Sequence, residues 1–497
     1  MPNTTTRLEN RLIRKDLLIN AAFIGGRWLK IGDLDLEDNS QFEVKDPSNG
    51  EVIATLPNLG RSEASAAIDA ADLAQKEWAA RTGKERASML RKWYNLMVAN
   101  ADDLAAILTA EMGKPLAEAK GEILYGASFI EWFSEEAKRV YGDMIPGHQP
   151  DKRIMVLKQP VGVVASITPW NFPNAMIARK VGPALAVGCA FVAKPAAETP
   201  LSALAMAKLA EEAGLPAGLF SVVTSKSSSD IGLEFCENEK VRKLTFTGST
   251  EVGRILIKQS ADQVMKTSME LGGNAPFIVF DDADLDAAVE GAMISKYRNN
   301  GQTCVCANRI YVQAGVYDAF AEKLTAAVES MKVGDGFEDG VTAGPLISDA
   351  AVEKVEEHIK DATSKGASII VGGKKHDLGG TFFQPTVLKH VTRDMRIAID
   401  ETFGPVAPLF KFESVDDVIE QANDTIFGLA SYFYAQDLSK VWKIVEALEF
   451  GMVGVNTGLI STEVAPFGGI KQSGQGREGS SYGCDDYLEI KYVCLAV

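Results

Sequence analysis

Histidine is scarce in this chain, with four among 497 residues, and cysteine is nearly as rare, with six. No histidine lies close in sequence to a cysteine or at a spacing typical of metal ligands. The spacing of Cys304 and Cys306 is too tight for the usual zinc pattern. The cysteines are also too dispersed to form a disulfide framework. We therefore expect a reducing compartment and no metal site.

Long apolar runs and an excess of positive charge are missing too. No segment approaches the roughly 18 to 20 consecutive apolar residues that a membrane helix needs, and residues 1–20 lack the apolar core of a secretion signal. The net charge of -16 opposes binding to nucleic acids and anionic membranes. We predict a cytoplasmic protein without nucleic-acid or membrane partners. In such a protein an anionic substrate needs local arginine or lysine residues.

What the chain does have is a regular alternation of strands and helices. At roughly 150 residues per domain, its length suggests about three domains. Short apolar strands alternate with helical stretches over residues 161–260, and a second series runs from residue 275 to about residue 455. This alternation predicts an α/β fold with parallel sheets covered by helices, which bind ligands at the carboxyl ends of their strands.

The segments outside these two series are predicted to differ from them. We expect a loose arm over residues 1–20, short strands over 23–57 and mostly helix over 62–138. Residues 457–483 are expected to form a glycine-rich loop. Residues 487–496 are expected to form a final apolar strand, for which a neighbouring subunit is a candidate partner.

One motif in the glycine-rich loop is set aside. Residues 474–479 match G-x-G-x-x-G, but no strand precedes them and too little chain follows for a crossover unit. We interpret the match as a coincidence in a flexible loop.

Cys304 is the candidate nucleophile. It follows an amphipathic helical run over residues 283–298, whose end is marked by Gly301 at the position of a left-handed cap, and it precedes an apolar strand. A thiol on such a connection is held at both ends by regular structure. The alternative is that Cys304 fills space, as many free cysteines do.

Other polar groups follow the predicted strands. Asn171 lies between two prolines, so its amide is a preset donor for an oxyanion, although it could equally close a turn. Lys194 lies at a strand tip within reach of a ribose or phosphate. Gly248 permits close backbone approach, and Ser249 begins a helix whose free N–H groups favour a phosphate.

Two carboxylates complete the set. Glu270 lies among apolar residues and glycines, which would raise its pKa and suit it to act as a general base. Glu401 offers oxygens for hydroxyl groups, and Phe403 offers an aromatic wall. Each residue has an ordinary structural explanation, but their order along one α/β chain favours a single active site.

Together these motifs resemble those of the aldehyde dehydrogenases, and the resemblance covers residues 23–497. Within that superfamily the chain is most similar to succinate-semialdehyde dehydrogenases of the bacterial, NADP-using kind, through residues 296–309 and 466–471. The segments that carry the wider resemblance are PWNFP (169–173), FTGS (246–249), ELGG (270–273), GQTC (301–304) and ETFGP (401–405).

The resemblance implies a Rossmann-like parallel-sheet cofactor domain, an α/β catalytic domain and a small β oligomerisation arm. Residues 1–138 and 161–272 would form the NAD(P)-binding domain, and residues 273–455 the catalytic domain that carries Cys304. Residues 139–160 and 484–497 would supply the oligomerisation strands of a homo-dimer or homo-tetramer. Residues 456–483 would form a substrate-site loop that returns to the cofactor domain.

The resemblance also implies a mechanism. The Cys304 thiolate attacks the aldehyde carbon, while Asn171 and the backbone N–H of Cys304 hold the oxyanion. Hydride transfer to the nicotinamide leaves a thioester, which water activated by Glu270 hydrolyses. No histidine is required, which agrees with their scarcity.

For the cofactor, the resemblance puts the pyrophosphate on the helix that begins at Ser249, Glu401 at the nicotinamide ribose and Lys194 at the adenosine ribose. NAD-preferring relatives tend to carry a carboxylate three residues after the lysine. Here that residue is Ala197, so we predict NADP, with NAD as the weaker alternative because Glu198 follows. Further expected cofactor contacts are Thr168, Pro169, Trp170, Asn171, Pro195, Ala196, Gly248, Leu271 and Phe403.

For the substrate, the resemblance places Arg298, Arg179 and Ser461 around the carboxylate of succinate semialdehyde. It also suggests that Cys306 can pair with Cys304, as in the redox-switched members of the family.

Three alternatives stay open. The chain could oxidise another acidic semialdehyde such as glutarate semialdehyde. It could be an esterase or amidase that needs no nicotinamide, or a structural protein that binds the cofactor without turnover.

Overall fold

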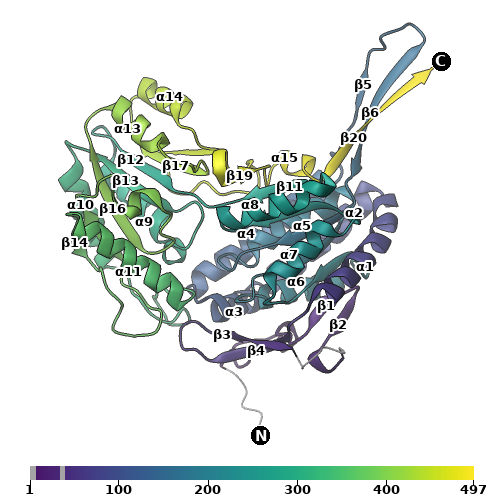
Figure 1. The fold of residues 1–497 in the computed structure, drawn as a ribbon, viewed down its shortest axis with the longest axis horizontal. Helices are drawn as coiled ribbons and strands as arrows, with labels where there is room; N and C mark the ends of the chain where they lie inside the picture. Colours follow the sequence, from purple (N-terminus) through teal and green to yellow (C-terminus); the bar gives the residue numbers. More distant parts are fainter. Residues whose placement is uncertain (1–6, 34–39) are drawn as a thin grey trace.

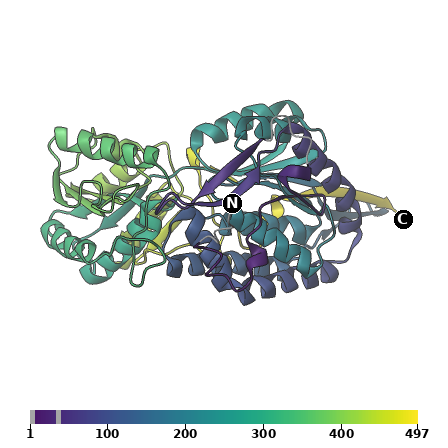
Figure 2. The same cartoon turned by 90° about the horizontal axis from the view of Figure 1, so that it is seen from below.

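The computed structural model describes residues 7–33 and 40–497. Two large sheets with their helices form two lobes that lie side by side, and a small third sheet projects from the body (Figures 1 and 2). Alternating strands and helices build both lobes, as the sequence predicts. No helix of residues 7–33 and 40–497 is long and apolar enough to cross a membrane.

The first sheet has eight strands in the order β19-β11-β10-β7-β8-β9-β1-β2. Its five central strands, from β11 to β9, run parallel. The chain moves outward from β7 through β8 to β9 and then returns to the other side of β7 with β10. Ligands bind such sheets where the strand order reverses in this way. The strands are β1 (Ala22–Ile24), β2 (Arg27–Leu29), β7 (Val163–Ile167), β8 (Ala190–Lys194), β9 (Phe220–Val222), β10 (Val241–Thr247), β11 (Lys266–Glu270) and β19 (Gly474–Gln475).

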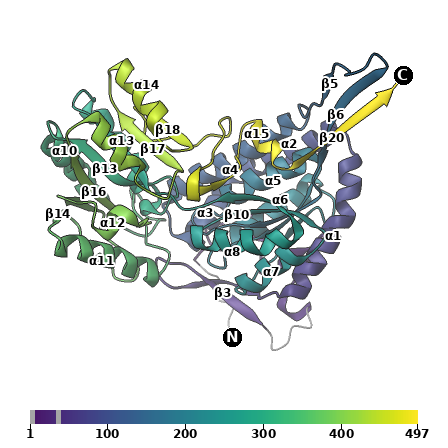
Figure 3. The same cartoon turned by 45° about the horizontal axis from the view of Figure 1, so that its top comes forward.

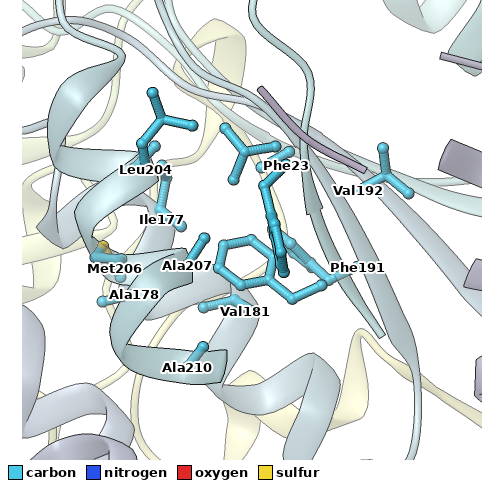
Figure 4. Close-up of a cluster of buried hydrophobic side chains, with 14 of the residues drawn as sticks. Phe23, Ile177, Ala178, Val181, Phe191, Val192, Leu204, Met206, Ala207 and Ala210 are labelled. Carbon is cyan, nitrogen blue, oxygen red and sulfur yellow. The ribbon is translucent and has the colours of Figure 1, made fainter. Parts of the chain in front are cut away.

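Helices accompany this sheet and bury its apolar side chains. Figure 4 shows Ile177 and Val181 of one helix and Leu204 of another on the side of β8 toward which Phe191 points, all of them buried. Each such side chain contributes about 1.5–3 kcal/mol when fully buried. The helices of this lobe are α1 (Arg61–Ala80), α2 (Gly83–Ala99), α3 (Ala101–Met112), α4 (Leu116–Glu136), α5 (Ala175–Val187), α6 (Leu201–Ala213), α7 (Ser228–Glu237) and α8 (Thr250–Ser260).

The second sheet has seven strands in the order β14-β15-β16-β13-β12-β17-β18, all parallel except β14. Its strands are β12 (Ala275–Val279), β13 (Ala307–Gln313), β14 (Ser368–Val371), β15 (Thr386–Lys389), β16 (Val406–Phe412), β17 (Ala430–Tyr434) and β18 (Met452–Val455). Its helices are α9 (Leu285–Tyr297), α10 (Tyr317–Glu329), α11 (Asp349–Ser364), α12 (Arg396–Ile399), α13 (Val415–Asn423) and α14 (Leu438–Ala447).

The projecting sheet pairs the last strand of the chain with a strand from before the first lobe's parallel core. Strand β20 (Leu488–Ala496) runs antiparallel to β6 (Lys152–Pro160), which pairs with β5 (Asp143–Ile145). The short helix α15 (Tyr482–Asp485) leads into it. The final strand predicted from the sequence therefore exists, and its partner β6 belongs to the same chain.

A hairpin of β3 (Gln41–Lys45) and β4 (Val52–Pro57) extends toward the second lobe (Figure 3). The hydroxyl of Thr381 donates a hydrogen bond to the carbonyl oxygen of Pro47 in its turn (3.3 Å). The hairpin therefore links the two lobes at the lower edge of the molecule in Figure 3.

Two predictions about irregular segments are wrong. Residues 7–20 are not a loose arm, because Leu8, Leu12 and Leu17 are buried and Asp103 accepts the backbone N–H groups of residues 13 and 14. Residues 1–6 of that prediction lie outside the described chain. Residues 474–479 are not a flexible loop, because β19 pairs with β11 and Glu478 is buried.

Candidate active site

A cavity of about 360 Å³ lies between the two sheets. Its wall combines residues that follow β7, β10 and β11 of the first sheet with residues that precede β12, β13 and β16 of the second. The carboxyl edge of one sheet thus meets the amino edge of the other, at the point where the first sheet's strand order reverses. The wall brings together these residues expected from the sequence: Pro169, Trp170, Asn171, Gly248, Ser249, Glu270, Leu271, Cys304, Glu401 and Phe403.

The turn before Cys304 uses an unusual backbone. After α9 ends, Asn299, Asn300 and Gly301 have φ angles of 51°, 54° and 75°. Asparagine and glycine tolerate this left-handed region better than other residues. A Cβ atom on Gly301 would lie 2.2 Å from the carbonyl oxygen of Gly404, so this position has room only for glycine. The left-handed conformation predicted at Gly301 is confirmed, and it begins two residues earlier than expected.

Cys304 is half-buried on the cavity wall. Desolvation raises the pKa of its thiol to about 12, and the positive charge of Arg179 opposes this rise. The thiol is therefore protonated near neutral pH in this state of the site, and a nucleophilic role requires that its proton be removed.

Glu270 ends strand β11, an element that the sequence did not reveal. Its carboxylate is buried, and neither oxygen has a hydrogen-bond partner within the described part of the chain. Burial raises its pKa well above the usual range, and the nearby carboxylate of Glu478 raises it further. Glu270 also forms no salt bridge with the described residues. A carboxylate in this state is suited to accept a proton.

Asn171 is fixed beside the nucleophile loop. Its side-chain Nδ2 donates a hydrogen bond to the backbone carbonyl oxygen of Gln302 (3.0 Å), two residues before Cys304. An amide nitrogen carries two hydrogens, so the second one is available to another acceptor.

An aromatic pair spans the two lobes at the cavity. The rings of Trp170 and Phe403 meet edge to face with centroids 5.5 Å apart. Beside them, Glu401 accepts the backbone N–H of Gly273 (3.2 Å), and desolvation raises its pKa to about 7. The Ser249 hydroxyl accepts the N–H of Val252 (3.3 Å) at the start of α8, which confirms the expected helix cap.

A second, more open cavity of about 1030 Å³ includes Ala197, Glu198 and Lys226 in its wall. Ala197 follows β8 and Lys226 follows β9, so the two come from neighbouring strand ends. The buried Lys194 donates to the carbonyl oxygen of Pro195 (3.2 Å), and burial lowers its pKa to about 8. Lys226 was not predicted from the sequence, although its position shortly after a predicted strand could have indicated it.

The backbone ties the ends of β7 and β8 together. The N–H of Thr168 donates to the carbonyl oxygen of Lys194 (3.2 Å). Thr168, Pro195 and Ala196 therefore lie on two adjacent loops at the carboxyl edge of the first sheet, although none of them lines the smaller cavity.

The two predicted substrate arginines have different surroundings. Arg179 is buried and forms an ion pair with Glu478, which also accepts Lys180. Its guanidinium lies 3.8 Å from the centroid of Phe467, and its Nη2 has no hydrogen-bond partner among the described residues. No local pattern indicates a role for Glu478, because it lies in the segment that we interpreted as a flexible loop.

Arg298 is half-buried, with its guanidinium 5.0 Å from the centroid of the Phe172 ring. Ser461 is half-buried in the loop after β18. Cys306 is buried, and its sulfur lies 3.2 Å from the carbonyl oxygen of Lys296. Both Cys304 and Cys306 are free thiols, and their pairing stays a prediction.

Residues 35–493 match the aldehyde dehydrogenase family, and the chain belongs to it. The protein is therefore an NAD(P)-dependent oxidoreductase that acts on aldehydes, with the fold of that family. This excludes a purely structural role and makes dehydrogenation, rather than ester or amide hydrolysis, its main reaction.

Its relatives narrow the class further. The chain is 64% identical to glutarate-semialdehyde dehydrogenase of Pseudomonas aeruginosa, over 95% of this chain and 97% of the relative. It is 61% identical to the NADP(+) succinate-semialdehyde dehydrogenase of Escherichia coli K12, over 98% of this chain and 99% of the relative. A crystal structure of succinate-semialdehyde dehydrogenase from Burkholderia pseudomallei superposes with a TM-score of 0.96 at 62% identity, over 98% and 100%.

Proposed function

We propose that this enzyme oxidises succinate semialdehyde to succinate and reduces NADP, through a thioester on Cys304. One observation carries the proposal: a single cavity unites a thiol, a fixed amide and a carboxylate that has no hydrogen-bond partner in the described chain. These are the three groups that acyl transfer through a thiol requires.

In the first step Cys304 attacks the aldehyde carbon. Its raised pKa means that a base must take the thiol proton, and Glu270, whose oxygens have no hydrogen-bond partner among the described residues, serves as that base. The free N–H of Asn171 and the backbone N–H of Cys304 stabilise the negative oxygen that forms. A bound nicotinamide would supply the acceptor for a hydride from the same carbon. The protonated Glu270 then releases this proton to solvent, and its carboxylate removes a proton from the water that attacks the thioester, which releases succinate and the Cys304 thiolate.

The residues around the first cavity fit a dinucleotide. The start of α8 at Ser249 offers free N–H groups to a pyrophosphate, and Glu401 offers oxygens to a ribose. In this proposal residues 1–138 and 161–272 bind the cofactor, and residues 273–455 supply the nucleophile. Residues 139–160 and 484–497 form the oligomerisation strands, and residues 456–483 complete the substrate site.

The choice of NADP rests on the second cavity. Ala197 leaves its wall without a carboxylate at the position three residues after Lys194, and Lys226 adds a positive charge there. A 2′-phosphate would gain from that charge, whereas a carboxylate at position 197 would repel it. Glu198 lies in the same wall and works in the opposite direction, so NAD stays the weaker alternative.

The choice of an acidic substrate rests on Arg298 and Arg179. Arg179 is buried and Arg298 is half-buried, and the Nη2 atom of Arg179 has no hydrogen-bond partner in the part of the chain that the structure describes. In a protein of net charge -16, two such cations favour a substrate with a carboxylate of its own. Glutarate semialdehyde, which is one carbon longer, is the alternative substrate, because the relative from Pseudomonas aeruginosa is named a glutarate-semialdehyde dehydrogenase.

Steady-state kinetics test this proposal. Succinate semialdehyde and glutarate semialdehyde are each assayed with NADP and with NAD. We expect the highest kcat/KM for succinate semialdehyde with NADP. A higher value for the longer semialdehyde would overturn the substrate, and a higher value with NAD would overturn the cofactor.

A further inference from the structure

A lysine–glutamate pair lies buried near the active site without lining either cavity described above. Lys114 Nζ donates a hydrogen bond to Glu122 Oε2 at 2.6 Å, and both side chains are about 1% exposed. Buried ion pairs often add little to stability, because the cost of removing two charges from water offsets their attraction. We therefore look for the role of this pair in the backbone groups that it also contacts.

Both members of the pair form hydrogen bonds with the segment that carries Asn171. Lys114 Nζ also donates to the backbone carbonyl oxygen of Asn171 (2.9 Å) and lies 3.7 Å from the centroid of Phe172. Glu122 Oε1 accepts the backbone N–H groups of Asn174 (3.0 Å) and Ala175 (3.2 Å) at the start of α5. The segment from Asn171 to α5 is thus held near both ends by one ion pair.

The nucleophile loop joins the same network. Asn299 Nδ2 donates to the carbonyl oxygens of both Asn171 and Gln302, each at 3.2 Å. The backbone N–H of Asn299 donates to Glu118 Oε2 (2.8 Å). The carbonyl oxygen of Asn171 therefore accepts two hydrogen bonds, one from Lys114 and one from Asn299 of the nucleophile loop.

We propose that Lys114 and Glu122 are positioning residues for the Asn171 amide. They hold its backbone so that the side-chain N–H and the Cys304 N–H converge on one substrate oxygen. Donors fixed before reaction stabilise an oxyanion most, and a displacement of about 1 Å in such a group can cost about 100-fold in rate. This inference rests on the oxyanion role proposed for Asn171.

A double-mutant cycle separates positioning from general support of the fold. We compare kcat at saturating substrate and cofactor for Lys114→Met, Asn171→Ala and the double variant. Asn171→Ala should lower kcat by about 10²–10³-fold, as for other oxyanion donors. Lys114→Met should lower kcat by roughly 10- to 100-fold in the wild-type background. In the Asn171→Ala background its effect should fall to less than about twofold, because the group that it positions is gone.

The outcomes are distinguishable. If Asn171→Ala lowers kcat but Lys114→Met costs the same factor in both backgrounds, the positioning role is overturned and the proposed function stands. If Asn171→Ala leaves kcat unchanged, the proposed oxyanion role is overturned, and this inference with it.

Glu122→Gln provides a second route, should Lys114→Met fail to fold. Its matched control is Asp103→Asn, because Asp103 is also buried, lines neither cavity and accepts the backbone N–H groups of Ile13 (2.9 Å) and Arg14 (2.8 Å). Both variants should lower Tm, but only Glu122→Gln should lower kcat. Equal kcat values for the two variants would contradict the inference.

Thiol alkylation supplies a readout that a collapsed loop would change. Displacement of iodide from iodoacetamide by Cys304 requires no oxyanion donor, so Lys114→Met and Glu122→Gln should keep the wild-type alkylation rate. A rate lowered as strongly as kcat would show that the nucleophile loop itself has moved, and would overturn the positioning role.

Discussion

The surroundings of Glu270 and Cys304 raise the pKa values of both side chains. The thiol pKa is raised to about 12 by desolvation, and the pKa of Glu270 is raised by burial and by Glu478. In the proposed mechanism the carboxylate form of Glu270 is the active one, because only it can accept a proton. A raised pKa therefore moves the pH at which activity appears upward from the ordinary range of a glutamate.

We predict that kcat falls as pH decreases through the raised pKa of Glu270, and that Glu270→Gln abolishes this fall. The variant should also lose about 10²–10⁴-fold in steady-state kcat, the usual contribution of a general base. The measurement is the pH profile of kcat for both proteins. An acid limb of unchanged shape in Glu270→Gln would assign the titration to another group.

Arg298 gives a prediction about specificity. Arg298→Ala should raise KM for succinate semialdehyde by about 10- to 100-fold, since a hydrogen bond between charged groups contributes about 1.5–3 kcal/mol. A neutral aldehyde of similar length has no carboxylate to lose this contact, so its KM should change little. Parallel assays of the two substrates measure the difference. Equal losses for both would refute the contact between Arg298 and the carboxylate.

Several of the residues that shape the site could be found from the sequence, and the reason is local. Asn171 lies between prolines, Ser249 caps a helix, and Gly301 ends one, so each carries its signal within a few residues. Lys114, Glu122 and Glu478 could not be found in this way. A charged residue is normally expected at the surface. Only the fold shows that Lys114 and Glu122 contact residues 171–175 and that Glu478 pairs with residues 179 and 180, which are far away along the chain.

At the scale of elements, strand β11 holds Glu270 and was not predicted. Its sequence, KTSME, has charged residues at both ends and only five residues, so it lacks the apolar pattern of its neighbours. It is a strand because β10 pairs with it on one side and β19 on the other. Long-range pairing of this kind overrides local propensity.

The contact between β11 and β19 can be tested at Gly474. Its φ angle is 137°, and an added Cβ atom would lie 1.9 Å from the carbonyl oxygen of Met269. Gly474→Ala should therefore displace β11, lower Tm by several degrees and reduce kcat at least about tenfold, since misplacing a catalytic group by about 1 Å can cost 100-fold.

Gly340→Ala is the matched control for this change. Gly340 also has a positive φ angle (75°), but no atom of the residues that the structure describes lies within 4 Å of an added Cβ. This variant carries the backbone strain of about 1–2 kcal/mol without the clash. Its kcat should equal that of the wild type. An equal loss of kcat in the two variants would mean that β19 does not position Glu270.

At the scale of the whole molecule, the projecting sheet of β5, β6 and β20 leaves large apolar side chains in solvent. Ile490 and Tyr492 are 73% and 60% exposed and lie on one face of β20, since residues two apart in a strand share a face. Exposed apolar groups on an edge strand favour association. We expect a second copy of the chain to cover this sheet, in a homo-dimer or homo-tetramer.

The variant with Ile490→Asp and Tyr492→Asp should therefore dissociate into smaller species in sedimentation velocity. Leu378→Asp serves as control, because Leu378 is 56% exposed but lies outside the projecting sheet. The control should sediment as the wild type does. An unchanged assembly in the double variant would show that this sheet does not form the subunit contact.

The arrangement of the two lobes is what sequence reasoning could least provide. It predicted each alternating series, but not that the carboxyl edge of one sheet would meet the amino edge of the other. Glu270 and Cys304 reach one cavity only through this meeting of edges. The family resemblance supplied the roles of these residues, and the fold supplies the surroundings that tune their pKa values.

The most direct test of the account is the mass of the enzyme trapped during turnover. The wild-type enzyme is mixed with succinate semialdehyde and NADP, quenched in acid at times within the first turnover and analysed by intact-protein and peptide mass spectrometry. The account predicts a succinyl group attached to Cys304, formed together with the first equivalent of reduced cofactor. Formation of reduced cofactor without an adduct, or an adduct on another residue, would contradict it.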